Sequence, residues 1–177
     1  IGVTGVQTCA LPIWNMIFDI TETRYDFDEA GNAEQLMQQH YESLGYKVLN
    51  NNFAVVYSPQ STKHPAAQKI VSELFDSHRL EAMDFFGKSV FPGDGVREQN
   101  PGQPDLLIYK PDKSEVFFSE VKTSKDWLKP GQMLGISVLT AFLGCRIEIA
   151  RVNGDPKSYR WVWPGLIPLH PEEVVQL

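Results

Sequence analysis

Two short apolar runs separated by a turn place the tightest limit on how this chain of 177 residues can fold. The first run is Leu106–Tyr109, and the second begins at Val116 and is closed by Glu120 and Lys122. Between them, Lys110–Ser114 combines a proline with charged and small polar residues, which favour a turn. Runs of this length joined by such a segment predict a β-hairpin.

Three charged residues lie on this hairpin. Asp105 opens the first strand, and Glu120 and Lys122 share one face of the second, about 6.6 Å apart, because side chains alternate along a strand. Antiparallel pairing can bring Asp105 beside Glu120. Two such carboxylates repel each other unless a cation lies between them, and Mg²⁺ or Mn²⁺ prefers such oxygen ligands. The pattern favours metal-assisted cutting of a phosphodiester, in which Lys122 positions the nucleophile or neutralises charge.

A plainer interpretation of the same residues exists. Charged side chains at strand ends are commonly solvated, and a Glu-x-Lys pair can protect an edge strand against pairing with another chain. Taken singly, each of the three residues fits this interpretation. The joint pattern and its flanking residues favour the site.

Helices are predicted on both sides of the hairpin. Asn32 with Gln35 is typical of a helix start, and Gly45 of its end. A strand over Tyr46–Leu49 follows. The apolar face of this helix comprises Leu36, Met37, His40, Tyr41 and Leu44.

Further along, a second helix is predicted from Pro65 to about Phe86. Pro130 and Gly144 bracket a third helix, and Arg146–Val152 alternates as a strand does. Tyr159–Trp163 can add another strand, whose aromatic residues could stack on bases but at this spacing are typical of a core.

Residues 102–152 resemble the VRR-NUC branch of the PD-(D/E)xK nuclease superfamily. The residues that carry the resemblance are Gly102, Pro104-Asp105, Glu120-Val121-Lys122, Asp126-x-Leu128, Gln132 and Gly144. The chain departs from the family in having Thr123-Ser124 where members commonly have Gly-Pro. The resemblance implies an α/β fold with a restriction-endonuclease-like core, a central mixed β-sheet flanked by helices in the order αβββαβ.

The resemblance also implies a divalent-metal nuclease. Asp105 and Glu120 would be metal ligands, Lys122 the catalytic lysine, and Gln132 a helix residue that faces the active site. Glu34 on the first helix would complete the metal site. An acid in a first turn also favours the helix dipole by about 0.3–1 kcal/mol, which would explain Glu34 without a metal, and Gln132 could be an ordinary polar first-turn residue.

The first residues of the chain are expected to have a different origin. Residues 3–13, VTGVQTCALPI, match the translation of a common sequencing-adapter DNA. We therefore expect residues 1–13 to be non-native, and residues 14–177 to form one nuclease-like domain with a helical insertion around residues 50–100. Without Cys9, only Cys145 remains, so no disulfide framework is possible and a reducing cytoplasm is the expected compartment.

The charge distribution bears on the partner. The net charge of −6 argues against a protein that coats nucleic acid, yet residues 105–160 hold nine basic and seven acidic residues. Candidates for phosphate contacts are Lys125, Lys129, Arg146, Arg151, Lys157 and Arg160, and the family resemblance adds Arg97. Any one of them could instead belong to a solvated face.

Three functions remain open on sequence alone. The first is a Mg²⁺-dependent deoxyribonuclease, with Mn²⁺ as a substitute, that acts on branched, flapped or foreign DNA. The second is a catalytically silent nucleic-acid-binding module of the same fold, and the third is a soluble scaffold. We expect DNA as the partner and no membrane contact, and a homodimer stays open.

Overall fold

The computed structural model describes residues 17–56, 64–90, 102–162 and 165–168, so the expected non-native segment, residues 1–13, lies outside the described residues. The chain divides into two compact units. The terminal unit comprises residues 1–20 and 158–177, and the main unit comprises residues 21–157. A sheet of three strands has the order β1-β7-β8, with bounds Ile17–Thr21, Ser158–Val162 and Gly165–Pro168.

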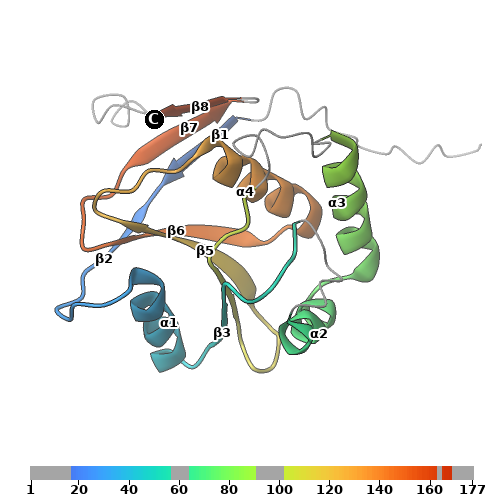
Figure 1. Cartoon of the computed structure of the whole chain (residues 1–177), viewed down its shortest axis with the longest axis horizontal. Helices are drawn as coiled ribbons and strands as arrows, with labels where there is room; N and C mark the ends of the chain where they lie inside the picture. Colours follow the sequence, from blue (N-terminus) through green and yellow to red (C-terminus); the bar gives the residue numbers. More distant parts are fainter. Residues whose placement is uncertain (1–16, 57–63, 91–101, 163–164, 169–177) are drawn as a thin grey trace, which may run out of the picture. The chain divides into compact units, whose positions relative to one another are not determined.

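The main unit is built on a sheet of five strands in the order β2-β6-β5-β4-β3 (Figure 1). Neighbours β2, β6 and β5 run parallel, whereas β5, β4 and β3 pair antiparallel, so the sheet is mixed as predicted. The strand bounds are Thr23–Tyr25 for β2, Lys47–Asn50 for β3, Leu106–Tyr109 for β4, Val116–Thr123 for β5 and Arg146–Val152 for β6.

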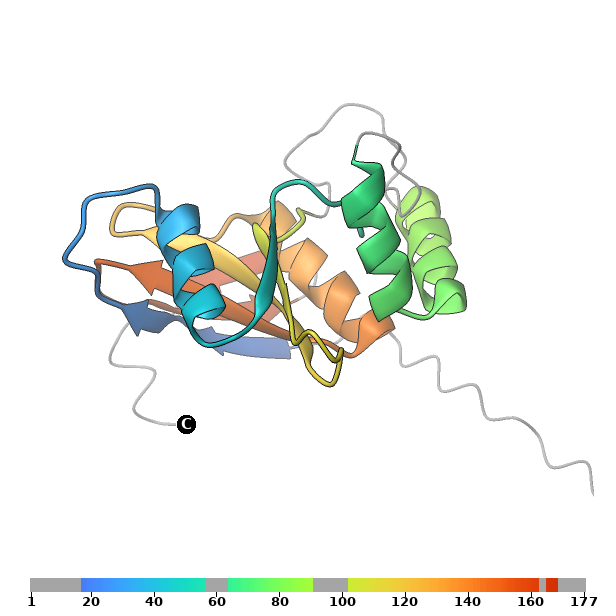
Figure 2. The same ribbon diagram turned by 90° about the horizontal axis from the view of Figure 1, so that it is seen from below.

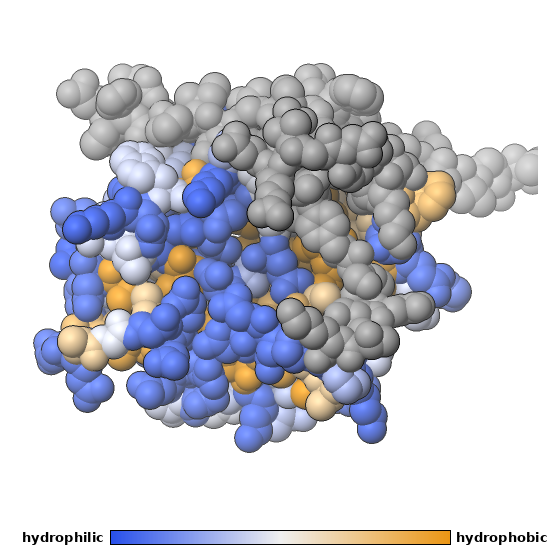
Figure 3. Space-filling model, in the orientation of Figure 1, coloured by the Kyte–Doolittle hydropathy of each residue, from blue (hydrophilic) through white to orange (hydrophobic). Residues whose placement is uncertain are grey.

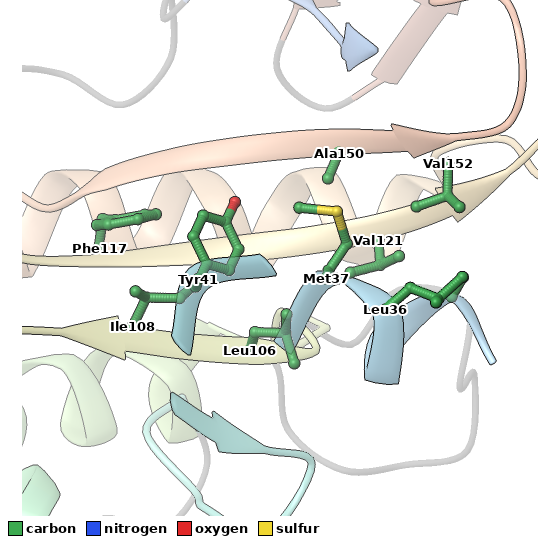
Figure 4. Packing of buried hydrophobic residues seen from close by; sticks show 10 residues of the cluster. Leu36, Met37, Tyr41, Leu106, Ile108, Phe117, Val121, Ala150 and Val152 are labelled. Atoms are coloured by element: carbon green, nitrogen blue, oxygen red, sulfur yellow. The ribbon is translucent and has the colours of Figure 1, made fainter. Parts of the chain in front are cut away.

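Two helices cover this sheet, α1 (Ala33–Ser43) and α4 (Pro130–Leu143), and they lie on opposite sides of it (Figure 1). The buried side of α1 packs on alternate residues of the strands, and this forms the main hydrophobic cluster (Figure 4). Members of the cluster include Leu36, Met37, Tyr41, Leu106, Ile108, Phe117, Val121, Ala150 and Val152. From α1 to β6, and with α2 and α3 left out, the elements run α1-β3-β4-β5-α4-β6, which confirms the predicted αβββαβ order.

The predicted hairpin is confirmed. In the β4–β5 pair, Leu106 lies opposite Ser119 and Tyr109 opposite Val116. Lys113 adopts a left-handed backbone conformation in the turn, and the carboxylate of Asp112 accepts the Ser114 N–H at 3.0 Å. Because β5 is longer than β4, its last residues pair with β6 alone.

The prediction of one helix from Pro65 to about Phe86 is wrong. The segment forms two helices, α2 (Pro65–Leu74) and α3 (Ser77–Val90), which follow one another in the chain (Figure 2). Phe75 is extended, and its ring stacks on Phe118 at 5.8 Å. Asp76 then starts α3 by accepting the Arg79 N–H at 3.1 Å. Core packing of one ring and a helix cap therefore override the apolar periodicity.

The prediction for the apolar face of α1 is wrong at one residue, which is exposed. Leu36, Met37 and Tyr41 are buried as expected, but Leu44 is 60% exposed. Leu44 is the C-cap residue, and the chain turns away at Gly45, whose φ of +88° is left-handed. The helical periodicity no longer applies once the helix has ended.

The described surface in the orientation of Figure 1 is mostly hydrophilic, and hydrophobic residues reach it in small separate areas (Figure 3). Among the described residues, no helix has the length and apolar character that crossing a bilayer requires.

Candidate active site

Asp105 lies directly before β4. Because Leu106 pairs with Ser119, the next position along β5 brings Glu120 beside Asp105. Asp105 Oδ2 accepts the backbone N–H of Val121 at 2.8 Å, so the carboxylate bridges the end of the short strand to the longer one. Burial raises the pKa of Asp105, and the Val121 N–H and the positive charge of Lys122 partly oppose that rise.

Glu120 is the most buried carboxylate of this group, with 1% of its surface exposed. Its Oε1 accepts a hydrogen bond from Lys122 Nζ at 2.5 Å and another from Gln132 Nε2. Burial raises the pKa of Glu120 to about 7 even though Lys122 acts in the opposite direction. The nearby Asp105 carboxylate adds to the rise because two negative charges disfavour each other.

Gln132 comes from the first turn of α4. Its Oε1 accepts the backbone N–H of Lys129 at 3.0 Å while its Nε2 donates to Glu120. Both ends of the amide are therefore used, which sets its orientation. The same side chain caps the helix and holds the buried carboxylate.

Two glycines allow α4 to come this close. Gly102 N–H donates to the carbonyl of Gly131 at 2.5 Å, and the backbones of Gly102 and Gly135 are in direct contact. A Cβ atom at Gly135 would collide with the carbonyl oxygen of Gly102 and lie 2.7 Å from its carbonyl carbon. The segment just before Asp105, residues 102–104, is called the lead-in to Asp105. It packs against the helix that carries Gln132 through this contact.

Gln103, two residues before Asp105, ties the same lead-in to the segment that follows β3. Its Oε1 accepts the Val55 N–H at 2.7 Å, and its Nε2 donates to the Phe53 carbonyl at 2.8 Å. Gln68 from α2 holds Ala54 in the same way, with bonds of 3.3 and 2.9 Å. Two side-chain amides thus form the hydrogen bonds with this backbone that a neighbouring strand would otherwise form.

The remaining predicted residues are distributed unevenly. Glu34 is half-buried in the first turn of α1, close enough that its charge helps to raise the pKa of both Asp105 and Glu120. Lys125 and Lys129 are exposed in the segment that joins β5 to α4. Arg97 lies outside the described residues.

Arg151 does not fit the interpretation as a phosphate contact. It is fully buried, and its Nε and Nη2 bind the two oxygens of Glu22 at 2.6 and 2.5 Å. Its Nη1 donates to the carbonyl oxygens of Thr123 and Asp126. Arg151 therefore holds the chain just after β5 and is inaccessible to a ligand.

Sequence reasoning also missed the role of two other residues here. Asp126 Oδ2 accepts the Thr123 N–H at 3.0 Å and the Thr123 hydroxyl at 2.5 Å, which lowers the pKa of Asp126. The spacing of three residues between Thr123 and Asp126 was the available signal. Glu22 had none, since it lies 129 residues from Arg151 in the chain.

The donor set fits a divalent cation of a particular kind. Asp105 Oδ1 and Glu120 Oε2 accept no hydrogen bond from the residues that the structure describes. Within those residues, no group of three or more His, Cys, Asp or Glu side chains is arranged to hold a metal ion. Mg²⁺ commonly takes one or two carboxylates and completes its shell with water and substrate phosphate. Asp105 and Glu120 suit that type of site better than an all-protein cage.

Comparison with known proteins identifies the family. The VRR-NUC domain model matches residues 29–154, well over half of the chain and all of Glu34, Asp105, Glu120, Lys122 and Gln132. The chain belongs to the VRR-NUC domain family, which confirms the resemblance found in the sequence, and the restriction-endonuclease-like fold class is confirmed as well.

The chain is also similar to a solved structure, paFAN1 bound to 5′-flap DNA with a two-nucleotide flap and a gap. The two share 12% sequence identity with a TM-score of 0.42, and the match covers 75% of this chain and 37% of that one. The chain thus corresponds to little more than a third of that protein's length. No curated protein matches the chain in sequence.

Proposed function

We propose that this protein is a Mg²⁺-dependent nuclease that hydrolyses DNA phosphodiester bonds. The observation that carries the proposal is the pair of half-buried Asp105 and buried Glu120, in which, among the described residues, each carboxylate keeps one oxygen that accepts no hydrogen bond. Membership of the VRR-NUC family supports it. Branched or flapped DNA, as met in repair, recombination or phage metabolism, is the proposed substrate.

Each residue has a task in this proposal. A divalent cation at Asp105 and Glu120 would polarise the phosphoryl oxygens and supply an activated water. Lys122 Nζ, already 2.5 Å from Glu120, provides a positive charge for the negative charge that develops on the phosphate. Gln132 holds Glu120 in place from α4. Glu34, which does not form a three-ligand group with Asp105 and Glu120 in this structure, is proposed to join them as a further ligand once a cation binds. Lys125, Lys129 and Arg97 are proposed as contacts to the DNA backbone.

One observation favours a second candidate, a nucleic-acid-binding module that does not cut. Lys122 and Gln132 both donate to Oε1 of Glu120, so this carboxylate also holds α4 against the sheet. If that were its only task, Oε2 would bind no cation and the protein would bind DNA without cutting it. Cleavage assays separate the two candidates.

The test compares supercoiled plasmid, single-stranded oligonucleotide and 5′-flapped DNA, each with Mg²⁺, Mn²⁺ or EDTA. We expect cleavage with either metal and none with EDTA. Asp105→Asn, Glu120→Gln and Lys122→Met should each reduce the rate by about 100-fold or more, as the loss of a charge-stabilising group does. Glu29→Gln, an exposed carboxylate outside the site, is the matched control and should keep the parent rate.

Two results would count against the nuclease. Cleavage that persists in EDTA would exclude the metal, and cleavage that survives both Asp105→Asn and Glu120→Gln would exclude this site. Binding of DNA without cutting under any metal condition would favour the silent module.

A further inference from the structure

An exposed tryptophan stands beside the candidate active site. Trp127 is 53% exposed and lies in the β5–α4 loop, residues 124–129, which joins Lys122 to Gln132. The other large hydrophobic side chains that are exposed in the described part of the chain, Leu44 and Phe85, lie on other elements, at the end of α1 and on α3. A single exposed apolar side chain is ordinary on a protein surface, so it is the place of Trp127 on the loop between two residues of the candidate site that points to a function.

The loop that carries Trp127 is firmly held on both sides of it. Asp126 is fixed through its side chain to Thr123, and its carbonyl accepts hydrogen bonds from Arg151 and from Lys157 Nζ, the latter at 2.7 Å. On the other side, Leu128 is only 3% exposed and anchors the chain in the core. The outward position of Trp127 therefore belongs to an ordered loop.

One lysine contacts the indole, and two more lie on the same loop. Lys157 Nζ lies 3.7 Å from the centroid of the Trp127 ring, which is a close cation–π contact. Lys125 and Lys129, on the same loop, are exposed. An aromatic face flanked by lysines is the arrangement with which proteins bind single-stranded nucleic acid, because the ring stacks on a base while the ammonium groups meet phosphates.

We infer that Trp127 and Lys157 form a stacking site for an unpaired nucleobase next to the cleavage site, a role that rests on the proposed nuclease function. Bases inside a duplex cover each other's faces, so only an unpaired or terminal base can present its face to the indole. The site would thus favour single-stranded or flapped DNA over continuous duplex. Lys125 and Lys129 would contact the backbone of either form.

The test measures fluorescence anisotropy of labelled DNA with the full chain in EDTA, so that the strands stay intact. Probes are a single strand, a 5′-flapped duplex and a blunt duplex of equal length. Trp127→Ala should weaken binding of the first two by roughly 10-fold, within the range found for base–aromatic stacking, and leave the blunt duplex within about twofold. Trp127→Phe should retain part of the affinity, whereas Trp127→Leu should behave like Trp127→Ala.

Matched controls separate stacking from other effects. Phe85→Ala removes another exposed aromatic ring and should bind all three probes as the parent does. Lys125→Ala with Lys129→Ala should weaken all probes alike and reduce the salt dependence of binding, which Trp127→Ala should leave unchanged. The thermal midpoint of each variant verifies its fold.

The inference would be overturned if Trp127→Ala bound each of the three probes as tightly as the parent does. It would also be overturned if Trp127→Ala lost as much affinity for the blunt duplex as for the other two probes, or if Trp127→Leu bound like the parent. The Mg²⁺ cleavage assay on the parent separates this result from the proposed function. Cleavage with no effect of Trp127→Ala on binding leaves the nuclease standing and removes the stacking site. Binding that depends on Trp127, in a parent that does not cleave DNA, removes the nuclease and leaves the stacking site standing.

Discussion

Two buried carboxylate–cation pairs lie on neighbouring strands of the same sheet, and they differ in one respect. Lys122 of β5 and Arg151 of β6 are direct partners in the strand register. Lys122 pairs with Glu120, and Arg151 pairs with Glu22. Both carboxylates are almost completely buried.

The hydrogen bonds distinguish the two pairs. Glu22 uses both oxygens, toward Arg151 Nε and Nη2 and toward the Lys157 N–H. Glu120 receives both of its donors on Oε1, and within the described residues Oε2 accepts none. A fully satisfied buried pair can only hold structure, whereas a partly satisfied one can still bind a ligand. The contrast supports a structural role for Glu22–Arg151 and agrees with the proposed catalytic role of Glu120–Lys122.

The largest effect on stability should come from breaking the satisfied pair. Glu22→Gln leaves the fully buried guanidinium of Arg151 without its counter-charge, and we expect a loss of about 3–5 kcal/mol in the free energy of unfolding. Urea titration followed by circular dichroism measures it. Asp26→Asn breaks the exposed pair with Arg24 and should cost less than about 1 kcal/mol. Similar losses in the two variants would remove the distinction between buried and exposed pairs.

The pH dependence of the metal-free protein tests the other pair. The pKa of Glu120 is raised from 4.5 to about 7, so the folded state retains a proton that the unfolded state has released. The stability from this group is present below pH 4.5 and is lost as the pH rises to about 7, by about 3 kcal/mol in all.

Urea titrations of the parent in EDTA between pH 5 and 8 should show this loss. The Glu120→Gln variant should lack it, and the parent should recover stability at pH 8 when Mg²⁺ is added. A parent whose stability stays flat or rises over this range in EDTA would contradict the raised pKa, and no response to Mg²⁺ would contradict a metal site at Glu120.

A smaller effect should follow from separating α4 from the lead-in to Asp105. Alanine usually stabilises a helix interior relative to glycine, by about 1 kcal/mol. Gly135→Ala should instead destabilise the protein by about 1–3 kcal/mol, because its Cβ would collide with Gly102. It should also reduce DNA cleavage by moving Gln132 away from Glu120. Thermal unfolding and the cleavage assay provide the two measurements.

Gly31→Ala is the matched control for this variant, since the nearest atoms to a Cβ there belong to the side chain of Leu36, at an ordinary contact distance of 3.4 Å. We expect parent-like cleavage from it. A Gly135→Ala protein more stable than the parent would show that the Gly102 contact does not constrain α4.

Much of the site followed from local sequence. The hairpin, with Asp105 beside Glu120 and Lys122 on the face of Glu120, needed only the alternation of strand side chains and a turn between two runs. The helix that begins at Pro130 followed from its start and stop residues. The position of Gln132 against Glu120 came instead from the family resemblance, because the contact depends on how far α4 approaches the sheet.

Other features depend on partners that no local pattern contains. The break between α2 and α3 arises where Phe75 leaves the helix to stack on Phe118, and the exposure of Leu44 arises where α1 stops. The sequence pattern favoured continuous helix and an apolar face in these places. In both, packing or chain reversal outweighed periodicity.

By itself, the sequence determined which groups could perform the chemistry, because residue type and a spacing of two along a strand are local properties. Only the tertiary structure decided which carboxylate uses both oxygens in hydrogen bonds and which, among the described residues, uses one. Glu22 and Arg151 are 129 residues apart, and the donors to Glu120 come from β5 and α4. Hydrogen-bond saturation depends on every neighbour in space, and those neighbours are known only once the chain has folded.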